Sequence, residues 1–219
     1  MFEFLQTPAS IRVFGILGGL VPLLACLVVA FAYRGKQGER YSLFNHFISE
    51  LGELGVSKLA PVFNIGLMVC GATLLPCCIG LGLLIPGAWS KLGMVFGVLA
   101  SIGVFSVGVF PMNYLKPHTI AAMSYFRLGM VMSIFFTLAI FAQPEEPPVL
   151  PRLLGLAGVP AVIAYASFLA YSQVKFKEVG QTLDPTTQIQ RPRIWVLTLL
   201  EWAIFLTTVP WFLAIGLLI

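Results

Sequence analysis

The chain has 219 residues, of which 58% are hydrophobic and only 10% are charged, and its formal net charge is +4. A soluble domain is about one quarter charged, because its surface faces water. The composition therefore excludes a soluble enzyme, a secreted disulfide scaffold, a disordered tail and a nucleic-acid-binding protein. It predicts an integral membrane protein whose outer surface is covered by lipid.

Six stretches are apolar and long enough to cross a bilayer, which takes roughly 20 mostly apolar residues. They are residues 13–33, 59–85, 92–115, 117–142, 153–174 and 194–218. Charged, proline and glycine residues separate them, and the connecting loops are short. We therefore predict an all-α, polytopic membrane protein. Its single domain, residues 1–219, is expected to form one antiparallel bundle of six transmembrane helices.

Lysine and arginine are divided unequally between the two ends of this bundle. Nine lie in or beside the loops that follow the first, third and fifth stretches, and three lie with the termini and the other loops. Cytoplasmic loops carry an excess of these residues in membrane proteins. The count places loops 1–2, 3–4 and 5–6 in the cytoplasm and both termini outside. Residues 175–193, which form the last of these loops, are expected to be solvated.

Between the first two stretches, residues 42–54 place polar and apolar side chains on opposite sides of a helix. The polar arc comprises Ser42, His46, Ser49, Glu50 and Glu53. The opposite side is formed by leucine, isoleucine and phenylalanine. We expect an amphipathic helix that lies at the membrane interface or dips back into the bundle.

Other polar residues lie within the apolar stretches, where they are costly and usually have a partner or a use. Asn64 lies just inside the second stretch, and His118 opens the fourth. Arg127 lies about ten residues into the fourth stretch, close to mid-membrane, and Glu201 lies roughly 10 Å into the sixth. Since an unpaired charge at this depth is costly, we expect Arg127 and Glu201 to attract each other across these two helices.

These polar residues define a predicted pocket at one membrane face. Its candidate ligand-binding residues are Ser49, Glu50, Glu53, Asn64, His118, Arg127 and Glu201. Simpler interpretations stay open for several of them. Residues 42–54 also fit a plain interfacial helix, Arg127 fits a side chain that snorkels to the interface, and a lone histidine is often only a satisfied polar residue.

Catalytic chemistry at this pocket would use His118 as a general base, with Glu50 orienting it. Ser49 is a candidate nucleophile, but it lacks the glycine-flanked turn that exposes a catalytic serine. Only two histidines are present, so a three-histidine metal site is impossible. His46 and His118 are weak candidates for metal ligands, and we predict neither a metal nor a cofactor.

Four short motifs resemble the domain of unknown function 998 family, a set of small prokaryotic six-helix membrane proteins. They are residues 48–52 (Ile-Ser-Glu-Leu-Gly), residues 61–64 (Pro-Val-Phe-Asn), residues 107–111 (Val-Gly-Val-Phe-Pro) and His118. The chain is also distantly similar to the eukaryotic Frag1/DRAM/Sfk1 group, whose first loop carries an Ile-Ser-Asp-x-Gly motif. In this chain Glu50 stands where that group has aspartate. That group also places its first loop outside the cytosol, opposite to the charge count here.

The resemblance implies a six-helix bundle in a bacterial or archaeal plasma membrane and no assigned reaction. Members of the eukaryotic group are linked to lipid remodelling, which favours a role toward membrane lipids. The leading hypothesis is a protein that binds a lipid head group or amphiphile in the predicted pocket, with or without lipid-modifying activity. The alternatives are a small transporter, and a non-catalytic subunit or assembly factor with a membrane-protein partner.

Overall fold

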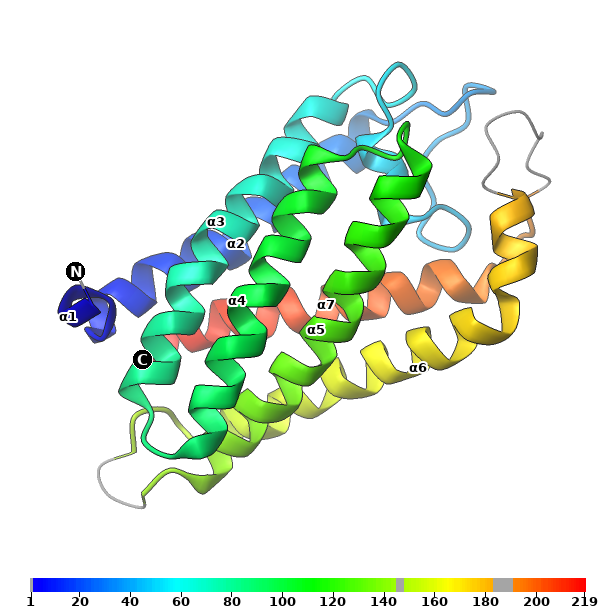
Figure 1. Cartoon of the computed structure of the whole chain (residues 1–219). Helices are drawn as coiled ribbons and strands as arrows, with labels where there is room; N and C mark the ends of the chain where they lie inside the picture. The colour runs from blue at the N-terminus through cyan, green and yellow to red at the C-terminus, as the bar shows by residue number, and fades with distance from the viewer. Residues whose placement is uncertain (1, 145–147, 183–190) are drawn as a thin grey trace.

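The computed structural model describes residues 2–144, 148–182 and 191–219 (Figure 1). The described residues form helices and loops. The helices are α1 (Phe2–Leu5), α2 (Pro8–Ala32), the 3-10 helix η1 (Ile48–Gly52), α3 (Ala60–Leu84), α4 (Ala88–Val109), α5 (Leu115–Ala142), α6 (Leu153–Thr182) and α7 (Val196–Leu218). Six of them are long and apolar enough to cross a membrane, and each span overlaps one predicted stretch, with ends that differ by at most about six residues. The predictions of an all-α fold and of six candidate spans are confirmed.

The long helices begin and continue for reasons that are visible in the sequence. At the start of α2, the Thr7 hydroxyl accepts a hydrogen bond from the Ser10 backbone N–H at 3.2 Å, and Pro8 occupies the first turn, where an N–H would have no partner. α3 runs through Pro76 without interruption.

The six long helices pack in a closed ring (Figure 1). Each helix from α2 to α7 contacts the next one along the chain, and α7 returns to contact α2. Glycine allows the closest approach at this last contact, because a Cβ atom on Gly15 would lie only 2.9 Å from the Cα atom of Gly216. A ring of this kind has an interior that its helices must fill with side chains or leave open.

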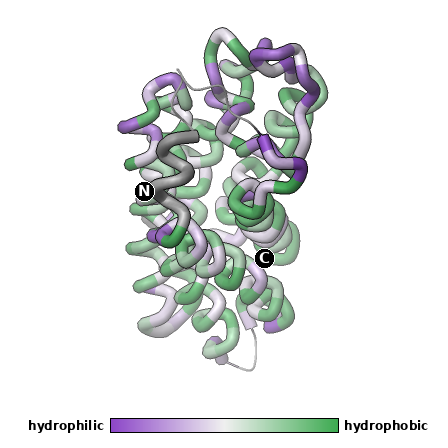
Figure 2. Tube along the Cα trace, turned by 90° about the vertical axis from the view of Figure 1, so that its right-hand side faces the viewer, coloured by the Kyte–Doolittle hydropathy of each residue, from purple (hydrophilic) through white to green (hydrophobic). Residues whose placement is uncertain are grey.

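Hydrophobic residues run along the helices, whereas hydrophilic stretches gather mainly in the loops at one end (Figure 2). That end carries the chain from Tyr33 to Leu59, which joins α2 to α3 and folds over the mouth of the ring. We call residues 41–54 of this loop the cap segment.

The cap segment corrects the prediction of an amphipathic helix over residues 42–54. Only the short 3-10 helix Ile48–Gly52 forms there, preceded by a turn. Buried side chains come from both predicted faces, with His46 and Glu50 as well as Phe47 and Leu51. The physical reason is that two backbone N–H groups of the segment bond to carboxylates instead of to carbonyls one helical turn earlier. Residues 46–48 and 50–52 are thereby buried, whereas Leu43, Phe44 and Leu54 stay exposed, and the segment is not a continuous two-sided helix.

Candidate functional site

A buried ion pair ties the cap segment to the chain just before α7. Arg191 donates to both carboxylate oxygens of Glu50, at 2.9 and 2.5 Å, and also donates to the backbone carbonyl of Asn45 at 3.1 Å. The Glu50 side chain is 3% exposed and that of Arg191 is 20% exposed. Glu50 also accepts a hydrogen bond from the Phe47 N–H at 2.8 Å. Its carboxylate is therefore saturated within the protein.

Two further contacts join the cap segment to α7 and its start. The Trp195 N–H donates to the Phe44 carbonyl at 2.7 Å. The Tyr41 hydroxyl donates to the Phe47 carbonyl at 2.9 Å and accepts from the indole N–H of Trp202 at 3.2 Å. Burial, together with the nearby charge of Glu201, raises the pKa of Tyr41 well above its ordinary value. Tyr41 therefore acts here as a neutral hydrogen-bonding group.

His46 is buried in the cap segment between the aromatic rings of Tyr33 and Tyr41. Its ring centre lies 5.5 Å from that of Tyr33 and 5.2 Å from that of Tyr41. Nε2 is buried without a hydrogen-bond partner, and the closest carboxylate oxygen, on Glu39, is 3.8 Å away. Burial disfavours the imidazolium ion and lowers the pKa of His46 below its ordinary value, although Glu50 and Glu39 oppose this shift.

Beneath the cap segment, two adjoining cavities open inside the ring. One has a cavity volume of about 70 Å³ and is walled mainly by α3, α4, α5 and α7, while the other has a cavity volume of about 120 Å³ and lies between the cap segment, α5, α6 and α7. Their walls are dominated by aliphatic and aromatic side chains. Five residues line both cavities: Ser49, His118, Ala122, Phe126 and Glu201.

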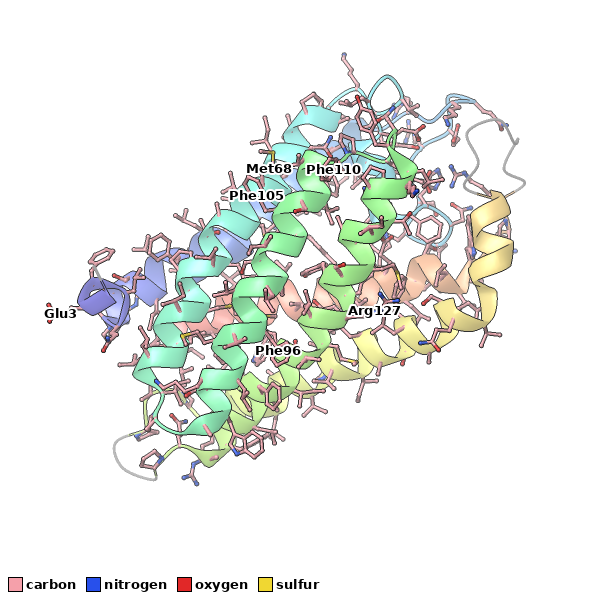
Figure 3. The ribbon with its side chains drawn as sticks, in the orientation of Figure 1. Glu3, Met68, Phe96, Phe105, Phe110 and Arg127 are labelled. Atoms are coloured by element: carbon pink, nitrogen blue, oxygen red, sulfur yellow. The ribbon has the colours of Figure 1, made fainter. Side chains whose placement is uncertain are left out.

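Three of these shared residues are polar, and all three were predicted from the sequence. The Glu201 Oε2 atom accepts a hydrogen bond from the Ile48 N–H at 2.8 Å. The Nδ1 atom of His118 lies 2.8 Å from the carbonyl oxygen of Phe110, the residue labelled at the end of α4 in Figure 3. The Ser49 hydroxyl donates to the sulfur of Met112 at 3.7 Å. The structure therefore brings Ser49, His118 and Glu201 together at the junction of the cavities.

The other predicted site residues have different surroundings. Glu50 is held by Arg191, as described above. Glu53 forms an ion pair with Lys36 at 2.8 Å near the surface. The Asn64 side chain donates to the Gly52 carbonyl at 3.0 Å, and thereby fixes η1 onto the start of α3. Neither Glu53 nor Asn64 lines the two cavities.

The expected pairing of Arg127 with Glu201 is wrong. Arg127 lies about half way along α5 (Figure 3) and is exposed. Glu201 is buried and receives its only hydrogen bond within the described residues from Ile48. The helical phase explains the difference, because Phe126 turns into the cavities and its neighbour Arg127 turns outward.

The predicted catalytic pair is not joined by a hydrogen bond, because His118 bonds to Phe110 and Glu50 bonds to Arg191. The two histidines also lie in different surroundings. Within the described part of the chain, no three His, Cys, Asp or Glu residues gather as a metal site would require. The arrangement at the junction is therefore one of hydrogen-bonding groups set in apolar walls.

Sequence reasoning missed Arg191, which it assigned to a solvated loop. Residues 183–190 of that loop lie outside the described residues, but Arg191 itself binds a carboxylate 141 residues away in the chain. The available signal was Glu50, a carboxylate without a cation within one helical turn of it. This carboxylate indicated that a cationic partner was needed, but the sequence did not indicate which lysine or arginine would provide it.

Comparison with protein families finds a match over most of the chain. The model described as "Protein of unknown function (DUF998)" covers residues 16–218, which includes all four motifs that carry the resemblance. Comparison with curated proteins and with solved structures finds no match. The more distant similarity to the Frag1/DRAM/Sfk1 group stays a prediction. The match to residues 16–218 shows that the chain belongs to the DUF998 family of proteins of unknown function.

Proposed function

We propose that this protein is an integral membrane protein that binds a single amphiphilic molecule, a membrane lipid or a lipid-like compound, inside its helix ring. The apolar chain of the ligand occupies the cavities, and its polar head group reaches Ser49, His118 and Glu201 under the cap segment. The six helices cross the membrane in alternating directions, with the capped end on the cytoplasmic side and both termini outside.

One observation carries this proposal: two apolar cavities meet at three polar side chains, of which His118 and Glu201 are buried and Ser49 is half-buried. Ligand sites in proteins are mostly apolar concavities with a few convergent polar groups that fix the orientation of the ligand. The combined walls suit a flexible hydrocarbon chain better than a sugar or nucleotide, because they offer few hydrogen-bonding groups away from the junction. A molecule with one polar end and one apolar end matches this division.

The position of the junction also favours a membrane lipid. Glu201 lies near the start of α7, and His118 lies near the start of α5, so both are within the first turns of helices that begin at the capped end. A lipid whose head group sits just below the membrane surface places its acyl chain at the depth of these cavities. The surplus of lysine and arginine in the loops at this end favours the cytoplasmic leaflet.

The test compares the amphiphile that co-purifies with the wild-type protein and with a variant whose cavity is filled. Ala122 lines both cavities, whereas Ile120 is 61% exposed on the outside of the same helix. We expect native mass spectrometry in mild detergent to find a bound amphiphile in the wild type and in Ile120→Phe, but not in Ala122→Phe.

Val107→Phe fills the first cavity from α4 and serves as a second variant where Ala122→Phe does not fold. Folding is checked by thermal unfolding of each variant. Equal retention of amphiphile in a folded cavity-filled variant and in Ile120→Phe would reject the proposal.

A further inference from the structure

The polar groups at the junction have hydrogen-bonding capacity that the protein leaves unused. The Nδ1 atom of His118 faces a carbonyl oxygen, which can only accept, so Nδ1 carries the proton of the neutral ring. The lone pair of Nε2 then accepts no hydrogen bond from the described part of the chain. Glu201 uses one oxygen for the Ile48 N–H, and Oε1 has no hydrogen bond within the described residues. These two groups offer acceptors to a ligand.

The third group, Ser49, is also available to a ligand. Its hydroxyl donates to the thioether sulfur of Met112, which is a weak acceptor. A ligand oxygen or nitrogen would replace that sulfur at little cost. The junction thus presents two unused acceptors and one hydroxyl that can either donate or accept.

The same junction lacks what an anionic head group requires. Among the described residues, those that line the two cavities include neither lysine nor arginine. The backbone N–H groups of Phe47 and Ile48, which would suit a phosphate, are already bonded to the carboxylates of Glu50 and Glu201, each at 2.8 Å. A buried anion without a counter-charge or amide donors is strongly disfavoured.

Arg191, which bonds to the cap segment, does not remedy this lack. Both terminal nitrogens of Arg191 are used by Glu50, and one of them also donates to the carbonyl of Asn45. Recruiting Arg191 to a ligand phosphate would leave the buried carboxylate of Glu50 without its partner, which is costly.

We propose that the ligand head group is an uncharged or cationic donor of hydrogen bonds, such as a glycerol hydroxyl or an amine, and not a phosphate or a carboxylate. The donor hydrogens of the head group meet Glu201 Oε1 and His118 Nε2, and Ser49 binds its remaining polar atom. This inference rests on the proposed function, because it assigns the chemistry of the ligand that the cavities would hold.

The test uses three amphiphiles with saturated chains of similar length: monopalmitoylglycerol, hexadecylamine and hexadecyl phosphate. Each is titrated into delipidated, purified protein in mild detergent, and the bound fraction is measured by native mass spectrometry. We expect the neutral and the cationic probe to bind at least about tenfold more tightly than hexadecyl phosphate. A tenfold ratio is small compared with the usual cost of burying a charged group without a partner of opposite charge.

Two variants test whether Glu201 is responsible for this preference among head groups. Glu201→Gln keeps the size of the side chain but adds N–H donors, so we expect it to weaken hexadecylamine binding by about tenfold and to narrow the difference from hexadecyl phosphate. Glu53→Gln is the matched control, because Glu53 lies in the same cap segment but outside the cavities, and it should keep the wild-type order of affinities.

The outcomes separate this inference from the proposed function. If hexadecyl phosphate binds as tightly as the other probes, and Ala122→Phe abolishes the binding of all three, the cavity holds amphiphiles and the head-group assignment is overturned. If Ala122→Phe leaves the binding of every probe unchanged, or no probe binds, the proposed function fails and the head-group assignment fails with it.

Discussion

Replacing Arg191 with alanine removes the partner of a buried carboxylate. Glu50 would keep only the Phe47 N–H as a donor, and the carbonyl of Asn45 would lose its hydrogen bond from the guanidinium. Removing one member of a buried ion pair costs roughly 3–5 kcal/mol. Because the Arg191 side chain is 20% exposed, water can reach one side of the pair, and we expect the lower end of this range, about 3 kcal/mol.

The assay is unfolding of the purified protein in mixed micelles, with a thermal melt as a second readout. For soluble domains of similar size a loss of about 3 kcal/mol corresponds to a decrease in Tm of roughly 6–12 °C, which serves as a guide here. Arg193→Ala is the matched control, because Arg193 is an exposed arginine two residues away. It should change the free energy of unfolding by less than about 0.5 kcal/mol.

A double-mutant cycle isolates the ion pair from other effects of the substitution. In the Glu50→Gln background no buried charge is left unpaired, so Arg191→Ala should cost only about 1 kcal/mol. Two results would refute the reasoning: the same loss from Arg191→Ala in both backgrounds, or a loss no larger than that from Arg193→Ala.

Three further changes test other parts of the structure by the same unfolding assay. Lys36→Ala breaks an ion pair whose lysine is 54% exposed, so it should cost less than about 1 kcal/mol, and a loss as large as that of Arg191→Ala would contradict the burial argument. Gly15→Ala places a Cβ atom 2.9 Å from the backbone Cα atom of Gly216 and should cost about 1–3 kcal/mol. Gly18→Ala places a Cβ atom 3.2 Å from the side-chain oxygen of Thr73, which needs to shift by only a few tenths of an ångström, and it should cost less; equal effects would argue against close packing of α2 and α7. Burial lowers the pKa of His46 below its ordinary value, so the unfolded chain takes up a proton there more readily than the folded chain, and stability should fall as pH drops from 7 to about 5. His46→Phe should lose less stability over that interval, and an unchanged pH profile would show that His46 is not responsible.

The sequence was sufficient to predict the six helices, because each needs only a long apolar run, and such runs are visible without knowing any neighbour. It also indicated Ser49, His118 and Glu201, because a polar side chain within or beside an apolar helix is conspicuous. All three line the junction of the cavities. Each of these residues could be recognised from its immediate neighbours in the sequence, without knowledge of the folded structure.

Contacts between distant segments were not predictable in the same way. The cap segment has the sequence periodicity of an amphipathic helix. The carboxylates of Glu50 and Glu201 nevertheless accept hydrogen bonds from two of its backbone N–H groups, and the segment folds as a turn and a 3-10 helix. Arg127 was assigned to the pocket from its depth alone. A difference of one residue in helical phase separates it from Phe126, which does line the cavities.

The most direct test of the central claim is photo-cross-linking in native membranes with a photoreactive phenylalanine analogue at position 126. Phe126 lines both cavities, and Ile120 on the same helix provides a control position that faces outward. We predict that the adduct at position 126 contains one class of amphiphile with a neutral or cationic head group, while position 120 yields the lipid mixture of the membrane. The same lipid mixture at both positions, or no lipid adduct at position 126, would contradict the account.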